Sequence, residues 1–213
     1  FFFFLKNDPF TKDELGMLLY FLKSPNDANY KIFVNKKAEI ISLMSEDIYK
    51  QFDANIKISK ILENSLDQKT GIINDEYFYK NATPLIGKAE AETALNRMKV
   101  MFYPSVSNYE GYEKAGWRYY KNYDNYDTEE LIKAAWIFSE HISNPMARRK
   151  AEEWAEKSVM KSENAENTYI LAKLYSKSGN KENAKMYAEI AKNLATTQGK
   201  DATMATKLLE TLK

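Results

Sequence analysis

Two segments in the second half of the chain share one pattern. Residues 151–159 read AEEWAEKSV and residues 184–192 read AKMYAEIAK, so Ala, an aromatic residue, Ala-Glu and a small residue recur 33 positions apart. Small residues are needed where two helices cross closely, and large ones fill the adjacent gap. Because one helical hairpin cannot bury its own apolar face, the pattern predicts at least two hairpins packed side by side.

The same offset relates further residues on both sides of these segments. The pairs are Trp136 with Tyr169, Phe138 with Leu171, Ile142 with Tyr175, Ala151 with Ala184, Trp154 with Tyr187, Ala155 with Ala188, and Ser158 with Ala191. A degenerate copy of the second-helix pattern lies at Tyr112, Ala115, Gly116 and Tyr119. We expect Ala155 and Ala188 to lie at close helix crossings.

Helical periodicity extends over nearly the whole chain. Apolar residues recur at three-to-four spacing, and the 213 residues include only 7 Gly and 5 Pro. We predict an all-α fold of antiparallel helical hairpins stacked as a short superhelix. Residues 1–104 are expected to form an N-terminal helical region, and residues 105–213 the repeats with a C-terminal capping helix.

Capping signals set the expected helix ends. Thr11 with Glu14, and Asp127 with Glu130, have the spacing of a capping box, and Gly179 is placed to end a helix. In the first half, one helix is expected to run through Ile32, Phe33, Ile40 and Leu43. Residues 75–86 are expected to form a short helix broken near Pro84.

The second copy of the repeat resembles the tetratricopeptide repeat, whose period is about 34 residues. The matching residues are Leu171, Ala172 and Tyr175 on the first helix, Gly179 at the turn, and Ala184 and Ala191 on the second helix. The resemblance implies a superhelical stack that binds protein or peptide partners.

A second resemblance covers about the last hundred residues. NYDNYD at 122–127, AAWIF at 134–138 and KAEEWAEKSV at 150–159 follow one another as in the helical C-terminal region of some bacterial thioredoxin-like proteins. It implies an accessory or dimerisation arm, in the periplasm and as a homodimer, for a redox domain upstream of Phe1. Without that resemblance we expect a cytoplasmic protein.

Composition excludes several functions. The 31 Lys and Arg residues are interspersed with 30 Asp and Glu residues, so no net field attracts nucleic acid. No apolar run approaches the roughly 18 residues that a membrane-spanning helix needs, so we expect a soluble chain without membrane insertion. The absence of Cys excludes a thiol nucleophile and thiolate metal sites, and no cofactor or metal is expected.

Two stretches are rich in aromatic residues. Residues 116–127, GWRYYKNYDNYD, would either belong to the core with hydroxyl groups at its rim, or form a contact surface for a peptide or glycan. The four Phe residues at 1–4 are expected to pack on the body or against a missing neighbour.

The predicted partner-binding surface is the groove between the first helices of successive hairpins. Its residues are those that do not point into the core: Trp136, Glu140, Glu166, Tyr169, Lys173, Ser176 and Lys177. Lys173 and Lys177 lie one helical turn apart, so together they would receive a carboxylate, or they are solvated lysines on an exposed helix. The two hypotheses for function are a peptide-binding scaffold and the thioredoxin-associated arm.

We predict that the chain has no catalytic activity of its own. His141 is the only histidine and is expected to cap a helix end or face solvent. The glutamates at 152, 153 and 156 are expected to be solvated, because Arg148 and Arg149 stand four residues before the first two and Lys157 stands four residues after Glu153. Assays of disulfide reduction and of ester and peptide hydrolysis should therefore show no turnover. Turnover that disappears in His141→Ala would contradict this prediction.

Overall fold

The structure, a computed structural model, describes residues 11–121 and 126–213. In these residues the secondary structure is twelve α-helices and one 3₁₀ helix, with an isolated bridge between Leu66 and Ile73. The prediction of an all-α fold is confirmed. The four Phe residues at 1–4 and the middle of the Tyr-rich stretch, residues 122–125, lie outside the described residues.

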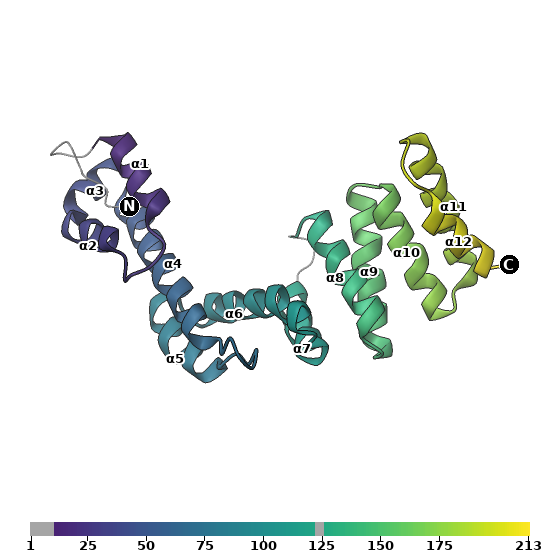
Figure 1. Ribbon diagram of the computed structural model, residues 1–213, viewed down its shortest axis with the longest axis horizontal. Coiled ribbons are helices and arrows are strands. Elements are labelled where there is room, and N and C mark those ends of the chain that lie inside the picture. The colour runs from purple at the N-terminus through teal and green to yellow at the C-terminus, as the bar shows by residue number, and fades with distance from the viewer. Residues whose placement is uncertain (1–10, 122–125) are drawn as a thin grey trace. The chain divides into compact units, whose positions relative to one another are not determined.

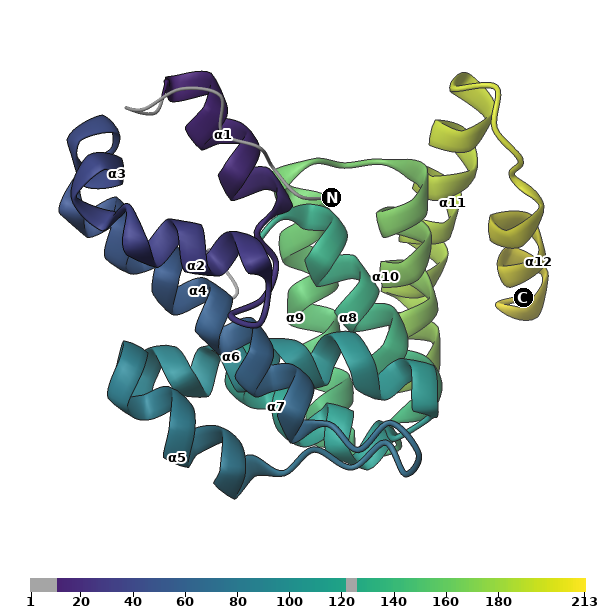
Figure 2. The same cartoon turned by 60° about the vertical axis from the view of Figure 1, so that its left-hand side comes forward.

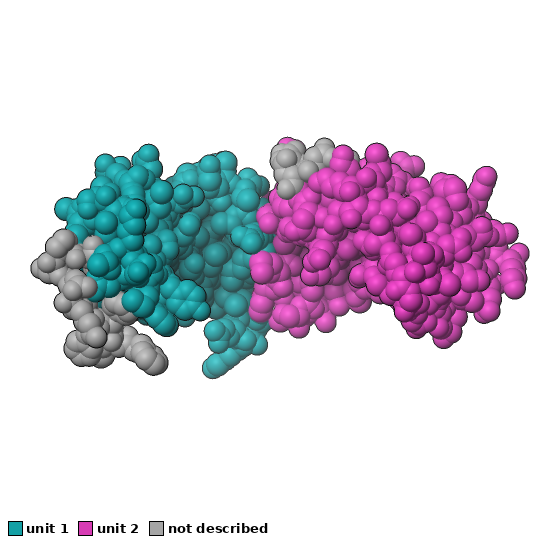
Figure 3. All heavy atoms as spheres, turned by 90° about the horizontal axis from the view of Figure 1, so that it is seen from above, with its two compact units in different colours: residues 1–98 teal, residues 99–213 magenta. Residues whose placement is uncertain are grey.

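The chain divides into two compact units, residues 1–98 and residues 99–213, coloured separately in Figure 3. Unit 1 holds α1 (Lys12–Phe21), α2 (Ala28–Asn35), α3 (Lys37–Leu43), α4 (Glu46–Ser65), α5 (Asp75–Ile86) and most of α6 (Lys88–Phe102). The division falls within α6, between residues 98 and 99.

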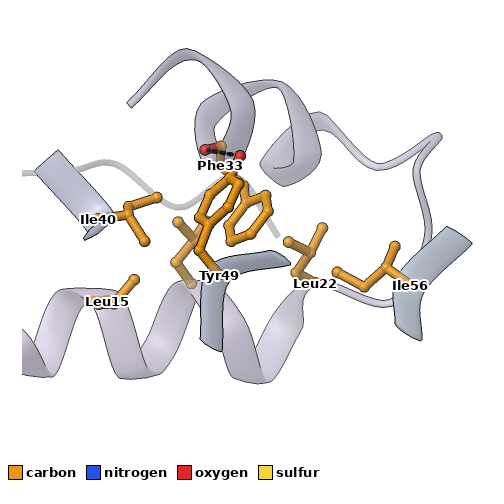
Figure 4. Packing of buried hydrophobic residues seen from close by; sticks show 7 residues of the cluster. Leu15, Leu22, Phe33, Ile40, Tyr49 and Ile56 are labelled. Carbon is orange, nitrogen blue, oxygen red and sulfur yellow. Dashed lines mark hydrogen bonds between the residues drawn. The ribbon is translucent and has the colours of Figure 1, made fainter. Parts of the chain in front are cut away.

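The core of unit 1 is built around one aromatic pair. The rings of Phe33 on α2 and Tyr49 on α4 stack with their centroids 4.4 Å apart, and the Tyr49 hydroxyl donates to the Phe33 carbonyl at 3.5 Å (Figure 4). Leu15 of α1 and Ile40 of α3 are buried in the same cluster. The four helices therefore share one apolar centre, and the polar end of Tyr49 has a partner inside it.

Two helices of unit 1 differ from the prediction. One helix was expected to run through Ile32 and Leu43, but the structure has two, α2 and α3. The backbone leaves helical geometry between them, at Lys36 (φ −99°, ψ 24°). That site has no Gly or Pro, so the sequence holds no breaking signal there. α5 continues through Pro84 and ends at Gly87, whose φ of 82° favours glycine. The expected break near Pro84 was wrong.

Unit 2 is a row of helices in which each packs on the next (Figures 1 and 2). After the end of α6 and the 3₁₀ helix η1 (Tyr103–Val106) come α7 (Tyr109–Tyr119), α8 (Thr128–His141), α9 (Pro145–Lys161), α10 (Ala165–Ser178), α11 (Lys181–Thr197) and α12 (Thr203–Thr211). α8 with α9 and α10 with α11 form two helical hairpins, and α9 also contacts α10.

The helix ends follow the capping signals in the sequence. The Thr11 hydroxyl accepts the Glu14 amide at 3.2 Å while the Glu14 carboxylate accepts the Thr11 amide at 3.0 Å, which completes a capping box. Asp127 accepts the Glu130 amide at 2.7 Å at the start of α8. Gly179 ends α10 in the left-handed region at φ 84°. The capping box at Thr11, the N-cap at Asp127 and the glycine after α10 are confirmed; the box was predicted at Asp127 as well, where the structure shows the N-cap bond alone.

Alanine faces allow the hairpins of unit 2 to pack closely. Ala151 and Ala155 on α9, and Ala184 and Ala188 on α11, are fully buried. The larger residues fill the space beside them: Trp154 is fully buried, with its ring 4.8 Å from that of Phe138 on α8. These are the positions at which the sequence pattern placed small and large residues.

The hairpins recur at a longer interval than the sequence match. α8 and α10 begin at residues 128 and 165, 37 positions apart, and α9 and α11 begin at residues 145 and 181, 36 positions apart. The sequence offset of 33 is about one helical turn shorter. With 3.6 residues per turn, positions one turn apart share a helix face, so the apolar pattern matches at either offset.

Enlarging a buried alanine should destabilise unit 2. Ala155→Leu and Ala188→Leu should each lower the free energy of unfolding by about 1 to 3 kcal/mol, because the added atoms have no free volume to enter. Glu153→Ala, at an exposed position on α9, should cost less than about 1 kcal/mol. Chemical denaturation of the three variants measures this, and unchanged stability of both Leu variants would show that α9 and α11 do not pack in this register.

Candidate functional site

A cavity of about 350 Å³ opens along α8 and α10, the first helices of the two hairpins. We call it the α8–α10 groove. Its wall is mainly apolar, and its residues come from three helices: Ile132, Lys133, Trp136 and Ile137 on α8, Glu166, Tyr169 and Ile170 on α10, and Met204 on α12. Trp136 and Tyr169 are half-buried, so part of each ring is accessible. The groove can accommodate apolar side chains.

A second cavity, of about 420 Å³, lies at the N-terminal ends of the same two helices and shares Ile132, Lys133 and Glu166 with the groove. Its buried polar groups already have partners. The Ser158 hydroxyl donates to the Thr128 carbonyl at 3.1 Å and accepts the Asn167 side-chain amide at 3.2 Å. These bonds join α8, α9 and α10. The polar groups of the second cavity therefore stabilise the packing of these three helices.

An ion cluster of Glu140, Lys173 and Lys177 connects α8 to α10. The Glu140 carboxylate oxygen Oε1 lies 2.8 Å from Lys173 Nζ and 3.0 Å from Lys177 Nζ. Lys177 Nζ also donates to the Ser139 carbonyl at 2.6 Å, near the C-terminal end of α8. Lys173 Nζ lies 4.2 Å from the centroid of the Trp136 ring, within range of a cation–π contact.

The lysines control the charge of Glu140. Burial by itself raises the pKa of this carboxyl, but hydrogen bonds from Lys173 and Lys177 and their positive charges lower it from an ordinary 4.5 to about 2. Glu140 is therefore ionised throughout the physiological range. The cluster is half-buried, with 26% of the Glu140 side chain and 24% of the Lys173 side chain exposed, so solvent screens it only in part.

The structure separates the seven predicted groove residues into three groups. Trp136, Glu166 and Tyr169 line the α8–α10 groove. Glu140, Lys173 and Lys177 form the ion cluster, so the two lysines already hold a carboxylate of the chain itself. Ser176 is half-buried on α10 and belongs to neither group.

Sequence reasoning missed several residues of the groove. Ile132 and Ile170 are buried, and an apolar side chain is as typical of a core position as of a groove wall, so residue type does not mark them as groove residues. Met204 is 56% exposed on α12, in a segment that the repeat pattern does not include. Alignment of α8 with α10 at the 37-residue interval would have indicated Ile132. At this interval Ile132 is equivalent to Tyr169, and Glu129 is equivalent to Glu166, and both Tyr169 and Glu166 are predicted groove residues.

Among the described residues of the Tyr-rich stretch, Gly116 and Tyr120 belong to the core of unit 2. Tyr120 is buried with its ring 5.1 Å from that of Trp154, and burial raises the pKa of its hydroxyl far above the usual range. Tyr112 is buried against Phe138. The Tyr126 hydroxyl, at the half-buried edge, donates to the Tyr119 carbonyl at 2.8 Å. The sequence allowed either a core with hydroxyl groups at its rim or a contact surface for a peptide or glycan. The geometry of Tyr120 and Tyr126 matches the first of these hypotheses.

The titratable residues singled out as catalytic candidates are dispersed. His141 is exposed, and its ring stacks on Tyr109 with centroids 3.9 Å apart. Glu153 pairs with Lys150, three residues earlier, at 2.5 Å. The Tyr175 hydroxyl donates to Glu156. No group of three or more His, Asp or Glu residues within 11–121 and 126–213 is placed to hold a metal ion.

Among the helices of the described residues, none combines the length and apolar character needed to cross a bilayer. Comparison of the chain with protein-family models, curated proteins and solved structures found no match.

The ion cluster should make stability depend on pH. Since the pKa of Glu140 is lower in the folded chain, its contribution is fully present above about pH 4.5 and is lost as the pH falls toward 2. At neutral pH, Glu140→Gln should lower the free energy of unfolding by about 1 to 2 kcal/mol.

Urea denaturation of both proteins across this range tests the assignment. The difference in unfolding free energy between wild type and Glu140→Gln should shrink as the pH falls from 4.5 to 2, since protonated Glu140 no longer attracts the lysines. A difference that stays constant down to pH 2 would show that the ion cluster does not form in solution.

Proposed function

We propose that this chain is a non-catalytic helical module that binds a peptide segment of a partner protein in the α8–α10 groove. The observation that carries the proposal is the mainly apolar cavity along the first helices of two successive hairpins. In helical-repeat proteins the stacking of equivalent helices creates extended binding surfaces of this kind. We further propose that the hairpins of unit 2 are a short superhelix of the tetratricopeptide type.

The lining of the groove indicates the chemistry of the ligand. Ile137, Trp136, Tyr169 and Met204 offer apolar and aromatic contacts, and such residues dominate the energy of most peptide interfaces. At its edge, Lys133 on α8 and Glu166 on α10 carry opposite charges that cancel. The proposed occupant is therefore a segment with one or two apolar anchor residues and no net charge.

Selection from a random peptide library, displayed against the whole chain, should yield peptides enriched in Leu, Met or Phe. Met204→Lys places a charge in the apolar wall and should weaken these peptides at least tenfold, about 1.4 kcal/mol of binding free energy. Met186→Lys is the matched control, because Met186 is 44% exposed on α11 and does not line the groove. Fluorescence anisotropy measures both affinities.

Two results would contradict the proposal. If the selection yields no binding peptide, the chain is not a peptide-binding module, and the hypothesis of an accessory or dimerisation arm gains. If Met204→Lys and Met186→Lys affect the selected peptides equally, binding takes place outside the α8–α10 groove.

A further inference from the structure

The ion cluster adjoins the α8–α10 groove at Trp136, which lines the groove and whose ring centroid lies 4.2 Å from Lys173 Nζ. Lys173 and Lys177 are the cations of α10 nearest to Trp136 and Glu140 of α8, and both contact the same oxygen of Glu140. The Ser139 hydroxyl lies 3.3 Å from that oxygen as well. The single hydrogen of that hydroxyl has a nearer acceptor in the Trp136 carbonyl at 2.9 Å, so the two lysines are the donors that hold the carboxylate oxygen.

Glu140 competes with any external carboxylate for these lysines. It is held on α8 beside them, so it acts as an intramolecular ligand whose effective concentration far exceeds that of a free peptide. Lys177 makes a further bond to the Ser139 carbonyl, and Lys173 faces the ring of Trp136. An incoming carboxylate would have to displace Glu140 and leave it half-buried without its partners.

We propose that Glu140 determines the specificity of the α8–α10 groove by excluding acidic segments. This inference rests on the proposed function of the groove. Glu140 neutralises the two cations that would attract a carboxylate, and through Lys173 it also holds a positive charge against the Trp136 ring. An apolar segment without acidic residues does not compete with the ion cluster and can enter the groove.

Lysine labelling tests the ion cluster without any ligand. Brief acetylation of the whole chain, read by mass spectrometry, should modify Lys173 and Lys177 slowly in wild type and several-fold faster in Glu140→Gln. Lys133 and Lys200, which are exposed, are the internal references. Glu189→Gln on α11 is the charge-matched control and should leave all four rates unchanged.

Two fluorescent peptides test the specificity. One alternates Leu with Glu, and the other has Gln in place of each Glu. Wild type and Glu189→Gln should prefer the Gln peptide, whereas Glu140→Gln should gain about tenfold or more in affinity for the Glu peptide and keep its affinity for the Gln peptide. Circular dichroism melts verify that each variant is folded.

The outcomes separate this inference from the proposed function. Equal acetylation of Lys173 and Lys177 in wild type and Glu140→Gln would overturn the inference, as would equal affinity of wild type for both peptides. Failure of the Glu peptide to gain affinity in Glu140→Gln would also overturn it. In each of these cases, library peptides whose binding is weakened by Met204→Lys would still support peptide binding in the α8–α10 groove. Only the absence of such peptides would contradict the proposed function itself.

Discussion

The packing of unit 2 depends on the alanine faces of α9 and α11. Because Ala151, Ala155, Ala184 and Ala188 have only a methyl group to bury, neighbouring helices can approach closely along these faces. α9 then lies in contact with both α8 and α10. The α8–α10 groove is lined mainly by the two helices that α9 contacts.

Polar contacts fix the same helices at both ends. At one end, Ser158 accepts from Asn167 and donates to the Thr128 carbonyl, which joins three helices through buried groups. At the other end, Glu140 of α8 binds Lys173 and Lys177 of α10. A buried polar group that finds a partner adds specificity to an apolar interface, because a shifted register would leave it unsatisfied. The mainly apolar α8–α10 groove lies between these contacts.

The charges of the chain serve packing more than long-range attraction. The nearly equal numbers of basic and acidic residues leave a formal net charge of +1. Several of these charges pair within one helix, such as Lys150 with Glu153, whereas Glu140 and its lysines pair between helices. Only the second kind constrains tertiary structure. The low pKa of Glu140 reflects this arrangement, since both partners are held by α10 and do not depend on a flexible neighbour.

The sequence by itself determined the helical class, the caps at Thr11, Asp127 and Gly179, and the small and large positions of the hairpin pattern, because these depend on neighbours within a turn or two. Trp136 and Tyr169, two of the residues predicted to face a groove, line the cavity along α8 and α10. The apolar pattern by itself left the interval between hairpins open, since a 3.6-residue period cannot distinguish a register from one shifted by a turn. The N-caps at Asp127 and Asn164 fix it at 37 residues. Tertiary structure alone decided that Lys173 and Lys177 bind Glu140, a contact between helices that no local pattern encodes.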